Sequence, residues 1–147
     1  MTVAYRTGDG VGDAMVLRWS HHPRCVGLAR SELRKVLCVW GWSSLEDVAV
    51  LVLSELFTTA LRQAKILTIG EIETRYVRVG HALRIEVHNA VEEPRQPIAD
   101  VPDPQRVCRV RLLKVLADRW GEQCSGPGRT GWAELDLPSR IGARHAG

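Results

Sequence analysis

The sequence predicts an α+β domain: a two-layer α/β sandwich in which a mixed, mainly antiparallel sheet is covered on one face by three helices. Three observations lead to this fold class. Three segments repeat apolar residues at helical spacing, several shorter segments alternate apolar and polar residues, and one pair of alternating segments adjoins through a tight turn. Strands joined as hairpins favour antiparallel pairing, and amphipathic helices then cover one sheet face.

Length, charge and cysteine usage bound the class of protein. The 147 residues suffice for one domain, and folding at this size buries about 68–70% of the surface of the unfolded chain. The formal net charge of +3 is small, so we expect no nucleic acid as partner. The four cysteines lack the close pairwise spacing of zinc ligands, and we expect small buried hydrophobes in a reducing compartment.

The composition of the two ends of the chain predicts how the protein is targeted and where the domain begins and ends. The N-terminus is polar and rich in glycine, unlike a signal peptide, and no apolar run approaches the roughly 18 residues of a membrane helix. We therefore expect a cytoplasmic protein that makes no membrane contact. Residues 1–12 are expected to be a flexible tail, residues 13–138 the folded domain, and residues 139–147 a C-terminal tail.

The first predicted elements are a strand and a helix. Residues 14–19 form a strand that ends at the turn His21-His22-Pro23, and Pro23 suits the first turn of the following helix. Gly41 ends this helix, because glycine is the usual residue just beyond a helix C-terminus. The apolar stripe of the helix consists of Val26, Ala29, Leu33, Val36, Leu37 and Trp40.

A second helix is predicted from Ser43, which forms a capping-box pattern with Glu46, to about Ala64. One acid, Glu55, falls on its apolar stripe. A carboxylate in that place is costly to desolvate unless it is paired or lines a wet cleft. The alternative is that Glu55 lies at the margin of the stripe and reaches solvent. The stripe comprises Val48, Leu51, Val52, Glu55, Leu56 and Thr59.

The second half of the chain is predicted to hold a hairpin, a long loop, a third helix and a final hairpin. Alternating residues flank Gly80-His81 on both sides, which favours a hairpin turn there. Four prolines interrupt any periodicity further along, which favours a long loop. In chain order the predicted elements are strands over residues 76–79 and 83–87, a loop over 89–105, a helix over 104–120 and a strand over 131–137.

Three segments in this order of elements resemble the GHKL ATPases, whose fold is called the Bergerat fold. Residues 54–60, S-E-L-F-T-T-A, resemble the N box, which usually reads S-E-L-V-T-N-A. Residues 83–89 resemble the strand that ends in the adenine-reading box, and residues 115–121 with 131–135 resemble the closing helix and strand. The resemblance spans residues 15–137 and is closest to actinobacterial ATP-binding regulators related to anti-sigma-factor serine kinases.

The resemblance places Glu55 and Thr59 in an ATP site. In the family the N-box acid positions or activates the attacking group, and an Asn four residues later holds Mg²⁺. Both reach the phosphates because residues four apart share a helix face. Glu55 matches the acid, but Thr59 stands at the Asn position. The Thr59 hydroxyl can ligate Mg²⁺ or bond back to the carbonyl oxygen of Glu55, so we expect weak metal binding at best.

Asn89 stands where the family has an aspartate that reads adenine. A carboxylate only accepts hydrogen bonds, whereas an amide has one acceptor and two donors, so the change weakens recognition without abolishing it. Residues 90–93 replace the family's small residues and include two acids, which disfavour a nearby polyphosphate.

Cys108-Arg109-Val110 stands where the family has Gly-Arg-Gly, whose backbone N–H groups hold phosphate. Glycine lets the backbone approach the ligand, whereas the Cβ atoms of Cys108 and Val110 crowd that space. The alternative interpretation is that these residues extend an ordinary helix. In either case the phosphate cradle of the family is lost.

These departures lead to the hypothesis of a vestigial ATP site in a non-catalytic regulatory protein. We expect no metal or cofactor, and protein–protein interaction in transcriptional regulation as its function. The resemblance implies a sigma factor or a STAS-domain antagonist as partner, and a homodimer; Trp40 and Trp42 are candidates for an interface or for the core. Two alternatives remain: an active ATP-dependent serine/threonine kinase that uses Glu55 with ATP and Mg²⁺, and a binder of another small anion.

Overall fold

The computed structural model describes residues 3–7, 14–67, 71–90, 106–125 and 128–138, and the side chains of residues 14–62, 71–89, 111–123 and 128–138. The elements are β1 (Val3–Thr7), β2 (Ala14–Trp19), α1 (Arg24–Trp40), a 3₁₀ turn η1 (Ser43–Leu45), α2 (Glu46–Leu67), β3 (Ile72–Val79), β4 (Ala82–Ala90), α3 (Arg106–Leu116), β5 (Arg119–Ser125) and β6 (Gly128–Asp136).

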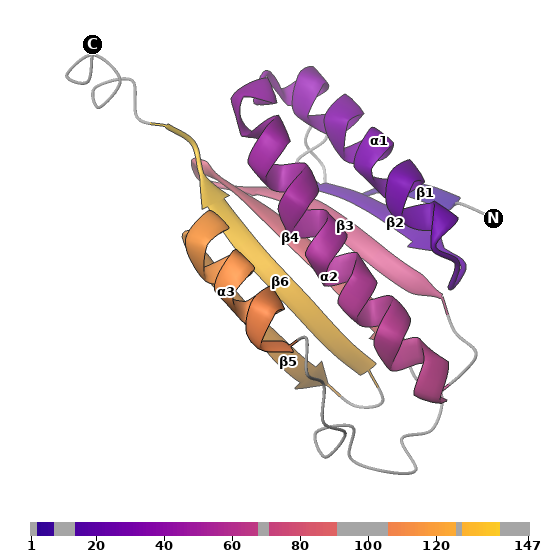
Figure 1. Ribbon diagram of the computed structural model, residues 1–147. Helices are drawn as coiled ribbons and strands as arrows, with labels where there is room; N and C mark the ends of the chain where they lie inside the picture. Colours follow the sequence, from indigo (N-terminus) through magenta and orange to yellow (C-terminus); the bar gives the residue numbers. More distant parts are fainter. Residues whose placement is uncertain (1–2, 8–13, 68–70, 91–105, 126–127, 139–147) are drawn as a thin grey trace.

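The strands form one six-stranded sheet in the order β1-β2-β3-β4-β6-β5, with the three helices on one face (Figure 1). The protein is therefore an α+β two-layer sandwich, as the sequence predicts. All neighbours in the described sheet are antiparallel, so the expectation of a mixed sheet is wrong. Two successive helices connect β2 to β3, and this double reversal returns the chain antiparallel to its first direction.

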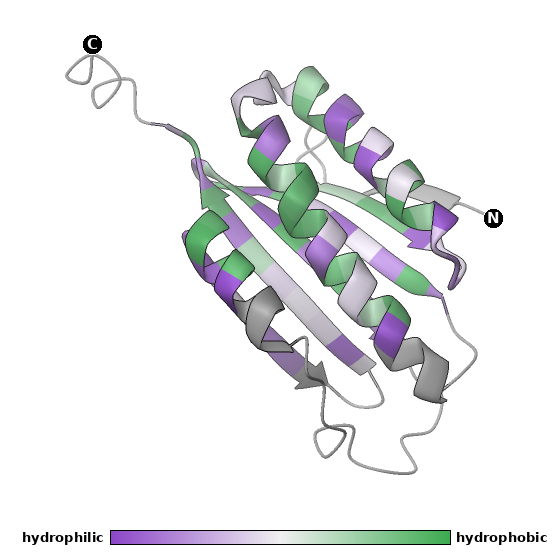
Figure 2. Cartoon of the chain, viewed as in Figure 1, coloured by the Kyte–Doolittle hydropathy of each residue, from purple (hydrophilic) through white to green (hydrophobic). Residues whose placement is uncertain are grey.

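One apolar core lies between the helices and the covered face of the sheet. In this layer α2 contacts β4 and β6, α1 contacts β3, and α3 contacts β5. Figure 2 shows apolar residues along the middle of α2 and polar residues on the outer helix turns. The largest fully buried side chains are Trp19, Tyr76, Phe57, Leu17, Leu33, Leu37, Leu53, Ile72, Leu83, Ile85, Leu135 and Val52.

The elements with the clearest local patterns are confirmed. The strand over Ala14–Trp19 and the end of α1 are as predicted, since Gly41 takes a left-handed conformation with φ of 73° just beyond the helix. Gly80, with φ of 61°, makes the turn between β3 and β4. Both glycines accept a backbone conformation that other residues rarely adopt.

Part of the predicted N-terminal tail is instead the edge strand β1. Its backbone pairs with β2 from Val3 opposite Arg18 to Thr7 opposite Ala14. A partner strand that follows in the sequence satisfies these backbone groups. The three glycines that follow Thr7 dominate the local composition, so the sequence around the strand gives no sign of this pairing.

The start of α2 also differs from prediction, because the capping box at Ser43 is wrong. The 3₁₀ turn of residues Ser43–Leu45 precedes α2, and no side-chain cap bond is present at the start of this turn. The Glu46 carboxylate pairs with Arg34 of α1 at 3.0 Å, so it is engaged between helices. α2 then extends to Leu67, beyond its predicted end. Within the described ranges no helix, α2 included, is long and apolar enough to cross a membrane.

The third helix is shorter than predicted. It ends at Leu116, and residues 119–125 form β5, so the expectation of a helix as far as residue 120 is wrong. The chain leaves α3 through Asp118, whose backbone N–H donates to the carbonyl oxygen of Glu134 at 3.0 Å. Pairing with β6 overrides the helical spacing of this segment.

The stability of the fold at alkaline pH is expected to depend on the Tyr76 phenol. It is fully buried and its O–H donates to the Ala29 carbonyl oxygen at 3.0 Å; burial raises the pKa of the phenol well above its ordinary value. Because the folded-state pKa is raised, this stability is present below the unfolded pKa of about 10 and is lost as pH rises further. We expect the free energy of unfolding to fall above about pH 10, and Tyr76→Phe to flatten that fall.

Denaturant titrations of both proteins at neutral and alkaline pH measure this difference. At neutral pH, Tyr76→Phe is expected to cost about 1 kcal/mol through the lost hydrogen bond. Parallel alkaline losses in the two proteins would show that another group titrates.

Candidate functional site

The predicted site residues of α2 lie on the flank that faces α3. Glu46 pairs with Arg34, so its side of α2 is the side toward α1. Glu55 follows about two and a half turns later, which places it on the opposite flank, toward α3 (Figure 1). Thr59 lies one turn beyond and shares this flank. Helical spacing therefore places Glu55 and Thr59 on the flank of α2 that faces α3.

Glu55 lies at the margin of the buried stripe of α2. Glu55 is half-buried, and Leu51, one turn earlier, is 50% exposed. The predicted apolar stripe includes both residues, so it is rotated by part of a turn from the face of α2 that is buried. Among the described side chains, none forms a hydrogen bond or ion pair with the Glu55 carboxylate. The solvent-reaching alternative therefore fits the structure. The buried residues of α2 are Ala49, Val52, Leu53, Leu56, Phe57 and Ala60.

The Thr59 hydroxyl is engaged by the helix itself. It donates to the carbonyl oxygen of Glu55 at 2.8 Å, which is one of the two alternatives that the sequence leaves open. Ser54 repeats the arrangement one turn earlier, with its hydroxyl donating to the carbonyl oxygen of Val50 at 2.7 Å. Thr59 thus holds its side chain against the helix backbone instead of extending it toward a ligand.

Asn89 is almost fully buried, at 2% exposure, near the end of β4. Its amide nitrogen donates to the Ala60 carbonyl oxygen of α2 at 3.2 Å. Its amide oxygen lies 3.2 Å from Nε2 of His21, in the turn between β2 and α1. Each end of the side chain therefore makes one hydrogen bond within the protein, and a ligand would compete with these bonds in a buried site.

His21 belongs to the candidate site, although the sequence analysis gave it no role there. His22 turns the other way, and its Nδ1 accepts a hydrogen bond from the backbone N–H of Arg24 at 3.1 Å. This bond caps the first turn of α1, where the residue before the helix, Pro23, makes no side-chain cap bond. The signal in the sequence is a histidine pair placed between a strand and a helix start.

The third part of the predicted site lies in α3. The backbone of Cys108, Arg109 and Val110 is helical, which agrees with the alternative that these residues extend an ordinary helix. Their side chains lie outside the described part of the structure. The predicted loop over residues 91–105 also lies outside it, whereas Asn89 and Ala90 belong to β4.

The described residues do not fit Mg²⁺ and a nucleotide at the places that the resemblance implies. Thr59 donates to a helix carbonyl, and the Asn89 amide is occupied at both ends. Of these three residues Glu55 alone presents an oxygen without a partner among the described side chains, and a single carboxylate does not make a magnesium site. In the described residues no group of three His, Cys, Asp or Glu side chains is placed to hold a metal ion.

Trp40 and Trp42 form a separate aromatic cluster at the end of α1. Their rings meet edge to face with centroids 5.8 Å apart, and the Arg78 guanidinium lies 5.0 Å from the Trp40 ring and 5.8 Å from the Trp42 ring. Both rings are half-buried and pack against the core. Each Trp therefore serves the core in part and keeps part of its surface exposed.

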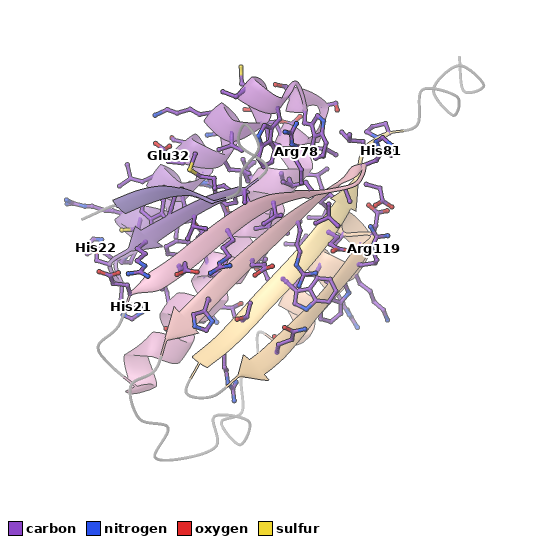
Figure 3. All side chains as sticks on the ribbon, turned by 180° about the vertical axis from the view of Figure 1, so that it is seen from behind. His21, His22, Glu32, Arg78, His81 and Arg119 are labelled. Carbon is purple, nitrogen blue, oxygen red and sulfur yellow. The ribbon has the colours of Figure 1, made fainter. Side chains whose placement is uncertain are left out.

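The face of the sheet opposite the helices carries a charged network (Figure 3). Arg84 contacts Glu86 at 2.7 Å and Glu134 at 3.0 Å, and Arg119 contacts Glu134 at 2.7 Å and also pairs with Asp136. The hydrogen bonds from Arg119 hold the pKa of Glu134 and of Asp136 below their usual range. These charges satisfy one another at a wet surface, where ion pairs contribute little stability.

Trp132 lies on the same face, directly over Gly121 of the neighbouring strand. A Cβ atom at position 121 would come within 2.9 Å of three atoms of the indole. The Arg84 guanidinium lies 4.3 Å from the centroid of the Trp132 ring. The indole is therefore held by its own neighbours in the sheet.

No protein-family model and no curated protein sequence matches this chain. The functional argument therefore depends on the geometry around Asn89, Thr59 and Glu55.

Proposed function

We propose that the protein is a non-catalytic regulatory protein: a degenerate relative of anti-sigma-factor kinases that has lost ATP binding and acts by binding another protein. The observation that carries this proposal is the double engagement of Asn89. Its amide oxygen and nitrogen are both used within the fold, at 2% exposure. A buried amide with satisfied hydrogen bonds is stabilising where it stands, and a ligand gains little by replacing those bonds.

Two further contacts support the same proposal. The Thr59 hydroxyl is bonded to its own helix, so the side chain at the metal position of the family is turned away from a ligand. The backbone at Cys108-Arg109-Val110 is helical, so the N–H groups of Arg109 and Val110 are used within α3, and the segment has no glycine to let a phosphate approach. Metal binding, base recognition and phosphate binding are weakened together.

The proposed partner is a protein of the transcription machinery, a sigma factor or a STAS-domain antagonist, and the proposed setting is the cytoplasm. The setting is the one expected from the cysteine usage, and the partner comes from the resemblance of residues 54–60, 83–89 and 115–121 to the family. Homodimerisation is proposed on the same ground. The exposed parts of Trp40 and Trp42 have the composition of an interaction surface.

We expect ATP with Mg²⁺ to show no measurable binding at millimolar nucleotide. The physical reason is that a nucleotide would compete with the contact between His21 and the buried Asn89 amide and would gain no phosphate cradle in exchange. Isothermal calorimetry with the full chain is the measurement. A micromolar dissociation constant would overturn the proposal in favour of an active ATP-dependent kinase that uses Glu55.

A pair of variants distinguishes weak ATP binding at the candidate site from weak ATP binding elsewhere on the protein. Thr59→Ala and Ser54→Ala each remove a hydroxyl that bonds back to its helix, but only Thr59 lies on the flank of Glu55. Any heat that changes with Thr59→Ala and not with Ser54→Ala arises at the candidate site, and counts against the proposal. Heat that neither variant changes is binding elsewhere on the surface.

A further inference from the structure

Asn89 joins three elements that are far apart in the sequence. It belongs to β4, its amide nitrogen is bonded to α2 at Ala60, and its amide oxygen is bonded to the β2–α1 turn at His21. Figure 3 shows His21 at the end of the molecule where these elements meet. The end of the sheet is therefore tied to both neighbouring helices through one side chain.

The chemistry of the amide determines which ring nitrogen of His21 carries hydrogen. The Ala60 carbonyl oxygen only accepts, so the Asn89 atom that faces it is the NH₂ group. The amide oxygen then faces His21 and accepts, so Nε2 of His21 is the donor. The contact requires an imidazole with its proton on Nε2.

We propose that His21 is an internal occupant of the candidate site, and that its Nε2–H takes the place of a ligand N–H group at the Asn89 amide oxygen. This inference rests on the proposed function, because it states how the site is closed to a nucleotide. His21 acts through its hydrogen bond to Asn89, which holds the amide in place. It supplies the one hydrogen-bond donor that the described residues offer to the buried amide oxygen.

The position of His21 is fixed from both sides in the sequence. Trp19, two residues earlier, is 1% exposed and its indole N–H donates to the Thr74 hydroxyl at 2.9 Å. His22, one residue later, holds the first turn of α1 through Arg24. The imidazole is thus presented to Asn89 by two anchored neighbours, at little further cost in chain entropy.

Nitrogen NMR of the imidazole side chains tests the protonation pattern directly. We expect His21 to show a single tautomer with hydrogen on Nε2, and the exposed His81 to average between tautomers in fast exchange. A His21 spectrum with hydrogen on Nδ1 and none on Nε2, or with the averaging seen for His81, overturns the proposal. This measurement needs no variant, so it stands even if substitutions at the site unfold the protein.

A double-mutant cycle tests the coupling between the two residues. His21→Ala is expected to lower Tm by about 2–8 °C, because it leaves the Asn89 oxygen buried without its donor, while the control His81→Ala leaves Tm within about 1 °C. In an Asn89→Ala background, His21→Ala is expected to change Tm by less than half as much. Equal losses in both backgrounds mean that the residues act independently, and overturn the proposal.

Added imidazole tests whether the vacated position accepts an external N–H donor. We expect imidazole to raise the Tm of His21→Ala and to leave that of His81→Ala unchanged. Equal shifts, or none, show that no such position exists, and the proposal fails. These results are independent of ATP: a wild-type protein that binds ATP refutes the proposed function, whereas an unrescued, uncoupled His21 refutes the occupant alone.

Discussion

Asn89→Asp is expected to destabilise the folded protein by about 3–5 kcal/mol at neutral pH, although it restores the residue of the family that the chain resembles. The amide nitrogen that now donates to the Ala60 carbonyl oxygen at 3.2 Å becomes a carboxylate oxygen facing that acceptor. At 2% exposure no water relieves the repulsion. The free energy of unfolding, measured by denaturant titration, reports the loss.

Acidification should reverse this loss. Burial raises the pKa of the new carboxyl in the folded protein, so its cost is full at high pH and disappears as pH falls below the unfolded pKa of about 4. The protonated carboxyl can again donate to Ala60. Gln123→Glu is the matched control, since it makes the same amide-to-acid change at an exposed position. Equal stabilities of the two variants at neutral pH would contradict the described environment of Asn89.

The same reasoning applies to attempts to restore an ATP site. Thr59→Asn combined with Asn89→Asp supplies the family's side chains. It also introduces an acid where the present fold provides one donor, from His21, and one acceptor, from Ala60. We therefore expect such variants to lose stability before they gain nucleotide affinity.

Trp19→Ala is the second large effect, with an expected loss of about 3–5 kcal/mol in the free energy of unfolding. Trp19 is among the largest fully buried side chains and meets Phe57 edge to face, with ring centroids 6.4 Å apart. Its removal leaves a cavity at the end of β2 and takes the indole donor from the buried Thr74 hydroxyl. Thermal or denaturant unfolding measures the change.

Two comparison variants separate the parts of this effect. Trp19→Phe keeps most of the buried surface and loses the N–H donor, so about 1–3 kcal/mol is expected. Trp132→Ala removes an indole of the same size from the uncovered sheet face, where it is half-exposed, and should cost clearly less than Trp19→Ala. A Trp19→Ala protein as stable as Trp132→Ala would mean that the core does not depend on this ring.

The fold class could be predicted because its signals are local. The stripes of α1 and α2, the alternation of β3 and β4 and the two turn glycines are all visible in adjacent residues. β1 and the bounds of β5 could not be predicted, although each pairs with the next strand in the sequence, because glycines follow β1 and the start of β5 continues the helical spacing of α3. Arg119 shows why: its salt bridges to β6 favour a strand in a segment whose spacing favours a helix.

The candidate site was predictable only in part. The bond from Thr59 to Glu55 follows from helix geometry and was among the sequence alternatives. The contact between His21 and Asn89 joins residues separated by three elements of helix and strand, and no spacing rule connects them. Sequence patterns identify what a helix or strand presents, whereas the partner of a buried polar group depends on the tertiary fold.

The indole of Trp132 lies over Gly121, so the residues that are tolerated at these two positions of adjacent strands depend on each other. While tryptophan occupies position 132 in its present place, a Cβ atom at 121 comes within 2.9 Å of the indole, so a substitution at 121 requires the indole to move. A lineage that first exchanges Trp132 for a small residue opens position 121 to change. The cost of a substitution at 121 therefore depends on which residue stands at 132.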